Sequence, residues 1–438
     1  MTLIYKLDNA PPVVQSALDE LGWHEFDEDE HQPEQWNLFW KTTRPTMGEF
    51  KSAKQYQKHI HFPKTGMLTT KDNLCRLMKK MKTIFGPVYN FSPTTFILPN
   101  EYKKFVEQFT KSDEKQIWIC KPADLSRGRK IFLISDIGEL QYDQQSIIQK
   151  YIANPLLIKG YKWDMRIYVL VTQARPLKFY LYKEGIVRFS SEKYDTSTIK
   201  NVYSHLTNSS INKFAANVNI MSGGAFGSGI KWNFSQLRSY LKVKQQLVFN
   251  LIYQDQGINY EKLWVRIESI IILTVINLAS QMPDLDCCFE LFGFDIMVDQ
   301  QLKPWLIEVN SSPAMSMDSN IDYQIKPDLI KDIIRLLSFE PYEQFLEKQK
   351  KKYSLIKQMG SNNFFKKRIQ GAQKATKFSF SPNIRRFNGQ STINTRRTEL
   401  FKKRSEVISQ EQSEDSKFDS NFNYEVYGAE VQQKHGKR

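Results

Sequence analysis

Two carboxylates and an amide interrupt an otherwise apolar stretch of the sequence. The segment FELFGFDIMVDQQLKPWLIEVNSSP (289–313) holds two runs of strand-forming residues around the polar turn DQQ, which predicts a β-hairpin. Asp295 belongs to the first run, and Glu308 and Asn310 belong to the second, where alternate residues share one face. Such side chains are costly to bury unless something binds them. Carboxylate and amide oxygens suit Mg²⁺, whose other ligands are usually water and substrate phosphate.

The pairing of the two strands decides whether these side chains meet. A hairpin that closes symmetrically about Gln300 and Gln301 pairs Asp295 with Leu306, which puts Asp295 diagonally across from Glu308 on the same face. The hairpin therefore predicts a divalent-cation site. A solvated hairpin face with ordinary acidic residues would give the same pattern, so the rest of the chain has to distinguish the two interpretations.

A second segment carries basic residues suited to phosphate. WICKPADLSRGRKIFLI (118–134) predicts a strand that ends at Lys121, a polar turn that contains Gly128, and a second strand. Such a turn can bring backbone amides together with Lys121, Arg127 and Arg129 around a polyphosphate. A basic surface hairpin has the same composition, because a single glycine does not make a phosphate-binding loop.

The segment IIQKYIANPLLIKGYKWDMRIYVLVT (147–172) adds a third set of polar residues. Its extended run Gln149–Ile152 can offer backbone groups to an adenine, as edge strands do for peptides. Asp164 and Arg166 alternate along a predicted strand and therefore share a face. A cross-strand salt bridge would explain this last pair equally well.

Net charge separates a late segment from the rest of the chain. The 438 residues carry a net charge of +15, and residues 345–405 hold 17 Lys or Arg against 2 Glu. A basic segment with little periodic apolar pattern is expected to be extended or disordered and to bind a polyanion. It lacks a recognisable RNA-binding signature, and the longest apolar stretch, 267–280, is too short and too polar to cross a bilayer. Neither a nucleic acid nor a membrane is therefore the expected partner.

The remaining pattern predicts a fold of the α/β (α+β) class. Short apolar runs typical of strands alternate with helical segments through residues 88–340. Helices are expected at 69–86, 235–281 and 327–339, and residues 343–358 can extend a helix.

Five segments together resemble the tubulin tyrosine ligase-like family and are nearest to its polyglutamylase branch. They are CKPADLSRGR, QKYIANPLLIKGYKWDMRIYVLVT, GIVRF, HLTNSSINK and CFELFGFDIMVDQQLKPWLIEVNSSPA, in the family's order and spacing, and the likeness covers residues 36–340. The resemblance implies an ATP-grasp fold, in which two α+β halves enclose Mg²⁺-ATP. We therefore expect an N-terminal region (1–87), a central ATP-grasp domain (88–160), a C-terminal ATP-grasp domain (161–342) and a basic, partly disordered extension (343–438) that binds microtubules.

The resemblance also assigns roles to individual residues. It implies that Arg166 and Glu308 are catalytic, with Arg166 contacting the transferred phosphate. This chain departs from the family's pattern at Lys130, where related chains usually carry glycine. The implied Mg²⁺ ligands are Asp295, Glu308 and Asn310, and the implied amino-acid contacts are Arg188, Lys231 and Lys326. The implied ATP contacts are Lys121, Ser126, Arg127, Gly128, Arg129, Gln149, Lys150, Tyr151, Ile152, Lys162, Asp164, Thr207 and Asn208.

The activity that the resemblance implies is ATP-dependent amide formation. A glutamate side chain in a tubulin C-terminal tail would become an acyl phosphate, and the amine of free L-glutamate would then displace the phosphate. Three alternatives stay open: glycine or tyrosine as the amino acid, an acidic acceptor other than tubulin, and a catalytically silent microtubule-binding protein. The expected partners are microtubules and free glutamate, and the expected location is the cytoplasm and its cytoskeleton, including the cilium or basal body.

Overall fold

The computed structural model describes residues 2–111, 116–125, 128–142, 144–212, 214–215, 230–251 and 260–360, without the side chains of 244–251 and 356–360. These residues belong to two compact units. The larger unit includes Thr2–Tyr342, and the smaller unit begins at Glu343. Of the smaller unit the structure describes helix α11 (Tyr342–Gly360), which agrees with the helix expected at 343–358. The basic extension beyond this helix lies outside the described residues.

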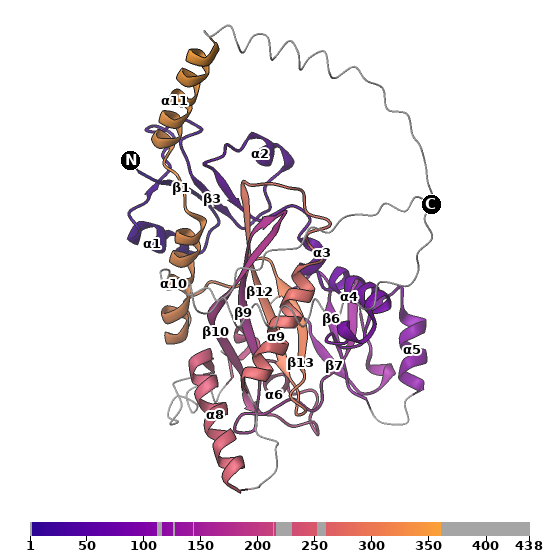
Figure 1. Ribbon diagram of the computed structural model, residues 1–438. Helices are drawn as coiled ribbons and strands as arrows, with labels where there is room; N and C mark the ends of the chain where they lie inside the picture. Colours follow the sequence, from indigo (N-terminus) through magenta and orange to yellow (C-terminus); the bar gives the residue numbers. More distant parts are fainter. Residues whose placement is uncertain are drawn as a thin grey trace, which may run out of the picture. The chain divides into compact units, whose positions relative to one another are not determined.

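A mixed sheet runs through the larger unit, and in the described residues it has nine strands in the order β11-β10-β9-β12-β4-β3-β1-β2, with β13 paired to β12. Figure 1 shows the long strands β9, β10 and β12 in the middle of this unit. β9 (Tyr161–Ala174) is antiparallel to both β10 (Leu177–Lys193) and β12 (Cys288–Val298). β13 (Pro304–Asn310) returns along β12, and β11 (Lys231–Asn233) pairs with β10.

The N-terminal residues extend this same sheet with parallel strands. β1 (Ile4–Asp8), β2 (His24–Glu25), β3 (Leu38–Lys41) and β4 (Lys58–Ile60) pair with one another, and β4 joins β12. Helix α1 (Pro12–Glu20) lies between β1 and β2 in the chain. The sequence analysis did not predict β1 or α1.

A smaller antiparallel sheet is formed by strands from residues 95–150. Its order is β5-β8-β6-β7, with β5 (Thr95–Leu98), β8 (Ser146–Lys150), β6 (Trp118–Pro122) and β7 (Phe132–Ile134). Phe105 of helix α5 (Tyr102–Thr110) packs with Leu98 and Trp118 in its core. The domain boundaries at 88, 161 and 343 stay a prediction.

Two apolar layers cover the two faces of the large sheet. Phe292 and Phe294 of β12 pack with Ile271 of helix α9 (Tyr260–Val275) on one face, whereas Leu291 packs with Leu329 of helix α10 (Asn320–Leu337) on the other. β12 is therefore buried along its whole length. A charged side chain within this strand needs specific partners, because burial penalises the charged form.

The observed helices agree with most of the expected positions, and the α/β fold class is confirmed. The helix expected at 69–86 is α4 (Lys71–Phe85), and the segment 235–281 forms α8 (Phe234–Leu251) and α9. The expected start at 327 was wrong, because α10 begins at Asn320 with Ser319 as its cap and contains Pro327. None of the described helices has the length and apolar composition needed to cross a bilayer. The shorter helices are α2 (Met47–Ser52), α3 (Gly66–Thr69), η1 (Gly86–Tyr89), η2 (Ile137–Glu139), α6 (Val202–His205) and α7 (Ser209–Asn212).

Candidate active site

The β12–β13 hairpin places Asp295 directly opposite Glu308. The predicted pairing of Asp295 with Leu306 was wrong, because Leu306 pairs with Ile296 and Ile307 is an extra residue in β13. A β-bulge of this kind shifts the register by one residue and re-aims the side chains beyond it. The bulge brings the two carboxylates face to face, where a regular hairpin would have set them diagonally.

Two arginines hold Asp295 and the neighbouring Asp164. Arg166 lies opposite Asp295 across β9 and β12 and donates from Nε to Oδ1 at 2.6 Å and from Nη2 to Oδ2 at 3.1 Å. Arg188 lies opposite Asp164 across β9 and β10 and donates from Nε and Nη2 at 2.7 Å each. The same Nη2 lies 2.8 Å from Asp295 Oδ2. Burial opposes ionisation of Asp295, but the two guanidinium groups outweigh it and hold the pKa of this carboxyl well below its usual range.

Glu308 has the opposite electrostatic environment. Burial, followed by the negative charge of Asp295, raises the pKa of the Glu308 carboxyl. Asn310 Nδ2 donates to Glu308 Oε1 at 3.2 Å, so these two side chains share a face as predicted. A divalent cation would relieve the repulsion between the carboxylates, and the all-oxygen donor set suits Mg²⁺. Within the described residues no three His, Cys, Asp or Glu side chains form a metal cluster. Asn310, which contacts Glu308, could supply an amide oxygen beside the two carboxylates.

Lys121 lies one residue before the end of strand β6, close to the predicted position, and its side chain is buried. Its Nζ donates to Gln149 Oε1 at 2.8 Å, and Gln149 Nε2 donates in turn to Thr95 Oγ1 at 2.9 Å. Burial lowers the pKa of Lys121 to about 8. Lys71 of α4, which the sequence analysis missed, donates from Nζ to the carbonyl of Leu125 and so holds the start of the glycine-containing loop.

Lys162 at the start of β9 is buried and contacts Tyr151, which belongs to the run predicted to bind adenine. Its Nζ donates to Tyr151 Oη at 2.8 Å and to the carbonyl of His205 at 2.7 Å. Burial lowers the pKa of Lys162 to about 7. Thr207 Oγ1 donates to Asp164 Oδ2 at 2.7 Å, which connects the 205–208 segment to the charged residues of β9.

The loop between β6 and β7 approaches the same place. Gly128 has φ +76°, and a Cβ there would lie 3.2 Å from the Asn208 Oδ1 and 2.5 Å from Ile211 Cδ1. Lys130 also has a positive φ, +53°, which costs a non-glycine residue roughly 1 kcal/mol. Glycine, which the family resemblance leads us to expect at this position, would adopt this backbone conformation without that cost. Ser126 and Arg127 lie outside the described residues, and the side chain of Arg129 is exposed.

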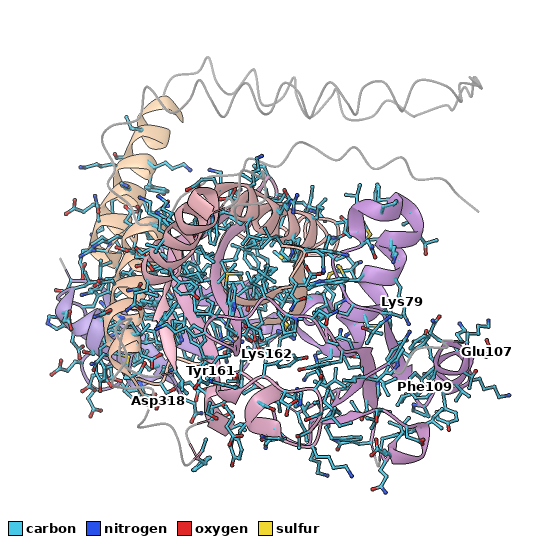
Figure 2. The ribbon with its side chains drawn as sticks, turned by 90° about the horizontal axis from the view of Figure 1, so that it is seen from below. Lys79, Glu107, Phe109, Tyr161, Lys162 and Asp318 are labelled. Atoms are coloured by element: carbon cyan, nitrogen blue, oxygen red, sulfur yellow. The ribbon has the colours of Figure 1, made fainter. Side chains whose placement is uncertain are left out.

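One pocket brings together most of the predicted nucleotide and metal residues. Figure 2 shows Lys162 in the middle of the larger unit, between Asp318 and Phe109 in that view. The pocket lies between the small sheet, the 205–208 segment and the β12–β13 hairpin. Its predicted lining residues are Lys121, Gln149, Lys150, Tyr151, Ile152, Lys162, Asp164, Arg188, Thr207, Asn208, Asp295 and Glu308.

The two predicted amino-acid lysines form a separate cluster. Lys231 of β11 lies opposite Arg188 of β10, which connects this cluster to the pocket through the sheet. Lys231 Nζ lies 2.6 Å from Asp322 Oδ2, and Lys326 Nζ lies 2.7 Å from Asp322 Oδ1. Asp322 is a functional candidate that sequence reasoning missed, because an acidic residue in the first turn of a helix is ordinarily explained by the helix dipole.

A buried histidine supports the loop that follows Asn310. His61 Nδ1 lies 2.7 Å from Glu290 Oε1, and Ser312 Oγ lies 3.5 Å from His61 Nε2. Glu290 also accepts from the backbone N–H of Phe62 at 2.8 Å. The sequence gives no signal for this set, because His61 and Glu290 are 229 residues apart.

Comparisons with known proteins find one matching family and several relatives of this chain. The tubulin-tyrosine ligase family matches residues 50–351. The chain is 44% identical over 344 residues to the probable tubulin polyglutamylase TTLL2 of Homo sapiens and 42% identical to the protein of the same name from Mus musculus. Each alignment covers 76% of this chain. A third relative, the tubulin polyglutamylase TTLL5 of Mus musculus, is 34% identical over 75% of this chain.

These relatives are longer than the matched region. The alignments cover 56% of the human and 61% of the mouse TTLL2 protein, and 24% of the mouse TTLL5 protein. The matched region nevertheless contains β6, β8, β9, β10 and the β12–β13 hairpin, which supply the charged residues of the pocket. The chain therefore belongs to the tubulin-tyrosine ligase family.

Proposed function

We propose that the protein is an ATP-dependent ligase that joins free L-glutamate to glutamate side chains of tubulin C-terminal tails through an acyl phosphate. The observation that carries the proposal is the union, in one pocket, of buried lysines with a carboxylate pair. Lys121 and Lys162 line the same pocket as Asp295 and Glu308. Buried cations suit the phosphates of a nucleotide, and opposed carboxylates suit the cation that accompanies it.

The chain's own residues then have distinct tasks. Lys121 and Lys162 bind and orient the phosphates, and Asp295, Glu308 and Asn310 would hold Mg²⁺. When bound there, Mg²⁺-ATP supplies the phosphoryl group that activates the acceptor carboxylate. Transferred phosphoryl groups develop negative charge on their oxygens, and preorganised cations stabilise that charge.

Arg166 is the residue proposed to stabilise the transferred phosphate. Its guanidinium is held in place by two hydrogen bonds to Asp295, so it needs no reorganisation when charge develops. Arg188 is proposed to bind a substrate carboxylate. Its Nε and Nη2 already contact Asp164 and Asp295, and among the described residues Nη1 remains as the donor for that carboxylate.

The identity of the substrates rests on the named relatives and on charge. The relatives are named tubulin polyglutamylases, and residues 345–405 with 17 Lys or Arg and 2 Glu complement an acidic tail. The amino group of glutamate would attack the activated carbonyl carbon, phosphate would leave, and a proton would be lost from the amine. Microtubules of the cytoplasm, the cilium or the basal body are the proposed place of action.

The proposal is tested by incubating the purified chain with microtubules, Mg²⁺, ATP and either glutamate, glycine or tyrosine. Intact-mass measurement of α- and β-tubulin should show additions of glutamate that require ATP. Addition of glycine or tyrosine in place of glutamate would show that the protein is a ligase of this family with a different amino-acid specificity. If no amino acid is added to tubulin but ATP is consumed with another acidic protein, the proposal that tubulin is the acceptor is wrong.

A further inference from the structure

A single buried carboxylate joins the two lysines near the amino-acid site. Asp322 is fully buried, with Oδ2 2.6 Å from Lys231 Nζ and Oδ1 2.7 Å from Lys326 Nζ. Ser319 Oγ also donates to Oδ2 at 2.6 Å, and Lys326 Nζ donates to the carbonyl of Ser316 at 2.6 Å. The lysine ammonium groups are therefore fixed relative to each other, although they come from β11 and α10.

This cluster carries one uncompensated positive charge. Lys231 is 7% exposed and Lys326 is 3% exposed, so neither ammonium is well solvated. Two ammonium groups and one carboxylate leave a net charge of about +1, which is costly in a buried place unless an anion joins it. Each ammonium has three N–H donors, so the contacts with Asp322 do not exhaust them.

A buried hydroxyl lies beside the cluster without a partner. Tyr168 of β9 is 1% exposed, and among the described residues its Oη has no hydrogen-bond partner. Tyr168 packs in the same buried cluster as Ile321 and Ile325 of α10, which flank Asp322 and Lys326 in the sequence. The charges of Arg166 and Asp322 are the ones that act on its hydroxyl most strongly. Burying an unpaired hydroxyl is unfavourable, so this atom is available to hydrogen-bond a polar group of a ligand.

We propose that Asp322 is a positioning residue for amino-acid selectivity: it holds Lys231 and Lys326 as one cationic unit that binds a carboxylate of an acidic amino acid. The hydroxyl of Tyr168 hydrogen-bonds the same substrate. Glycine has no side-chain carboxylate to offset the charge of this unit, so the cluster favours a dicarboxylic amino acid. This inference rests on the proposed function, because it assumes that the neighbouring pocket activates an acceptor for ligation.

The experiment uses the full chain and compares Asp322→Asn, Asp322→Glu and Asp328→Asn. Asp322→Asn should raise the KM for glutamate by about tenfold or more and leave the KM for ATP within about twofold, because the lysines lose their shared anchor. Asp322→Glu keeps the charge and should recover part of the loss. Asp328→Asn is the matched control, since Asp328 is an exposed partner of Lys331 on the same helix. An unchanged KM for glutamate in a folded Asp322→Asn protein overturns the proposal.

Tyr168→Phe provides a second variant in case Asp322→Asn fails to fold. It removes only an unpaired oxygen, so the melting temperature should stay equal or rise while the KM for glutamate rises severalfold. A Tyr168→Phe protein with the glutamate KM of the original chain would count against the proposal.

Calorimetric titration of glutamate, aspartate and glycine into the chain with a non-hydrolysable ATP analogue separates this proposal from the proposed function. Binding of glutamate that is lost in Asp322→Asn supports the selectivity role even if no tubulin is modified. Equal binding of glutamate and glycine by the original chain would overturn it.

Discussion

Glu308 lies directly opposite Asp295, and the two carboxylates have pKa values displaced in opposite directions. Arg166 and Arg188 keep Asp295 ionised despite its burial, whereas burial and the charge of Asp295 disfavour ionisation of Glu308. The negative charge of Asp295 is therefore compensated by protein cations, whereas a negative charge on Glu308 would need a further cation.

Replacement of Glu308 by glutamine tests whether this carboxylate holds the metal. Glu308→Gln keeps the shape of the side chain but weakens its hold on Mg²⁺, so the turnover number should fall on the order of 100-fold or more. The melting temperature should stay equal or rise, because the buried charge is removed. Glutamate addition to tubulin and thermal unfolding measure the two effects. Glu107→Gln, an exposed change on α5, is the control, and normal turnover of Glu308→Gln at saturating Mg²⁺-ATP would reject the site.

The pKa values of Lys121 and Lys162 predict that nucleotide binding takes up protons. Burial lowers these pKa values to about 8 and about 7, so both ammonium groups lose protons near neutral pH in the free protein. Anionic phosphates favour the protonated lysines and raise their pKa in the complex, so ATP affinity should decrease as pH rises through this range. Calorimetry in two buffers of different ionisation enthalpy measures the uptake. Lys121→Arg should reduce it, because a guanidinium stays protonated, and zero uptake in the original chain would contradict the assignment.

We expect nucleotide binding to require the absence of a side chain at Gly128, in addition to its positive φ. Gly128→Ala and Gly22→Ala both force alanine into a positive φ, +76° and +77°, so each should cost roughly 1 kcal/mol of unfolding free energy. A methyl group at Gly128 would also collide with Ile211 and crowd Asn208, whereas nothing lies within 4 Å of that position at Gly22. Only Gly128→Ala should therefore weaken ATP binding, which equilibrium titration measures. Equal ATP affinity in both variants would remove the loop from the binding site.

The basic segment should anchor the chain on microtubules. Truncation after Glu343 removes residues 345–405, which hold 17 Lys or Arg, and should weaken co-sedimentation with microtubules and tubulin modification sharply. ATP binding should be nearly unchanged, because the proposed nucleotide contacts all precede residue 311. Binding by the full chain should weaken between low and physiological salt, where the screening length falls to about 8 Å. A full-length variant with these basic residues changed to glutamine separates charge from length, and tight binding by the truncated chain at physiological salt would end the anchoring role.

The sequence by itself determined the elements that carry the pocket. Apolar alternation and turn residues located β6, β9, β10 and the β12–β13 hairpin, since these patterns reflect local backbone preference and burial. The polar residues that interrupt these runs were recognisable because buried strands seldom tolerate Asp295 or Lys121 without partners. Joint motifs in family order then identified the family, which the match over residues 50–351 confirms.

Tertiary structure decided the register and the partners. The extra residue Ile307 sets Asp295 opposite Glu308, and a hairpin's turn sequence does not reveal a bulge inside its strand. Asp322 meets Lys231 across 91 residues, and His61 meets Glu290 across 229. Such contacts leave no local periodicity, because they arise only when several strands and helices pack together. For that reason the sequence could nominate candidate binding residues, whereas the charges around each of them became clear only in the tertiary structure.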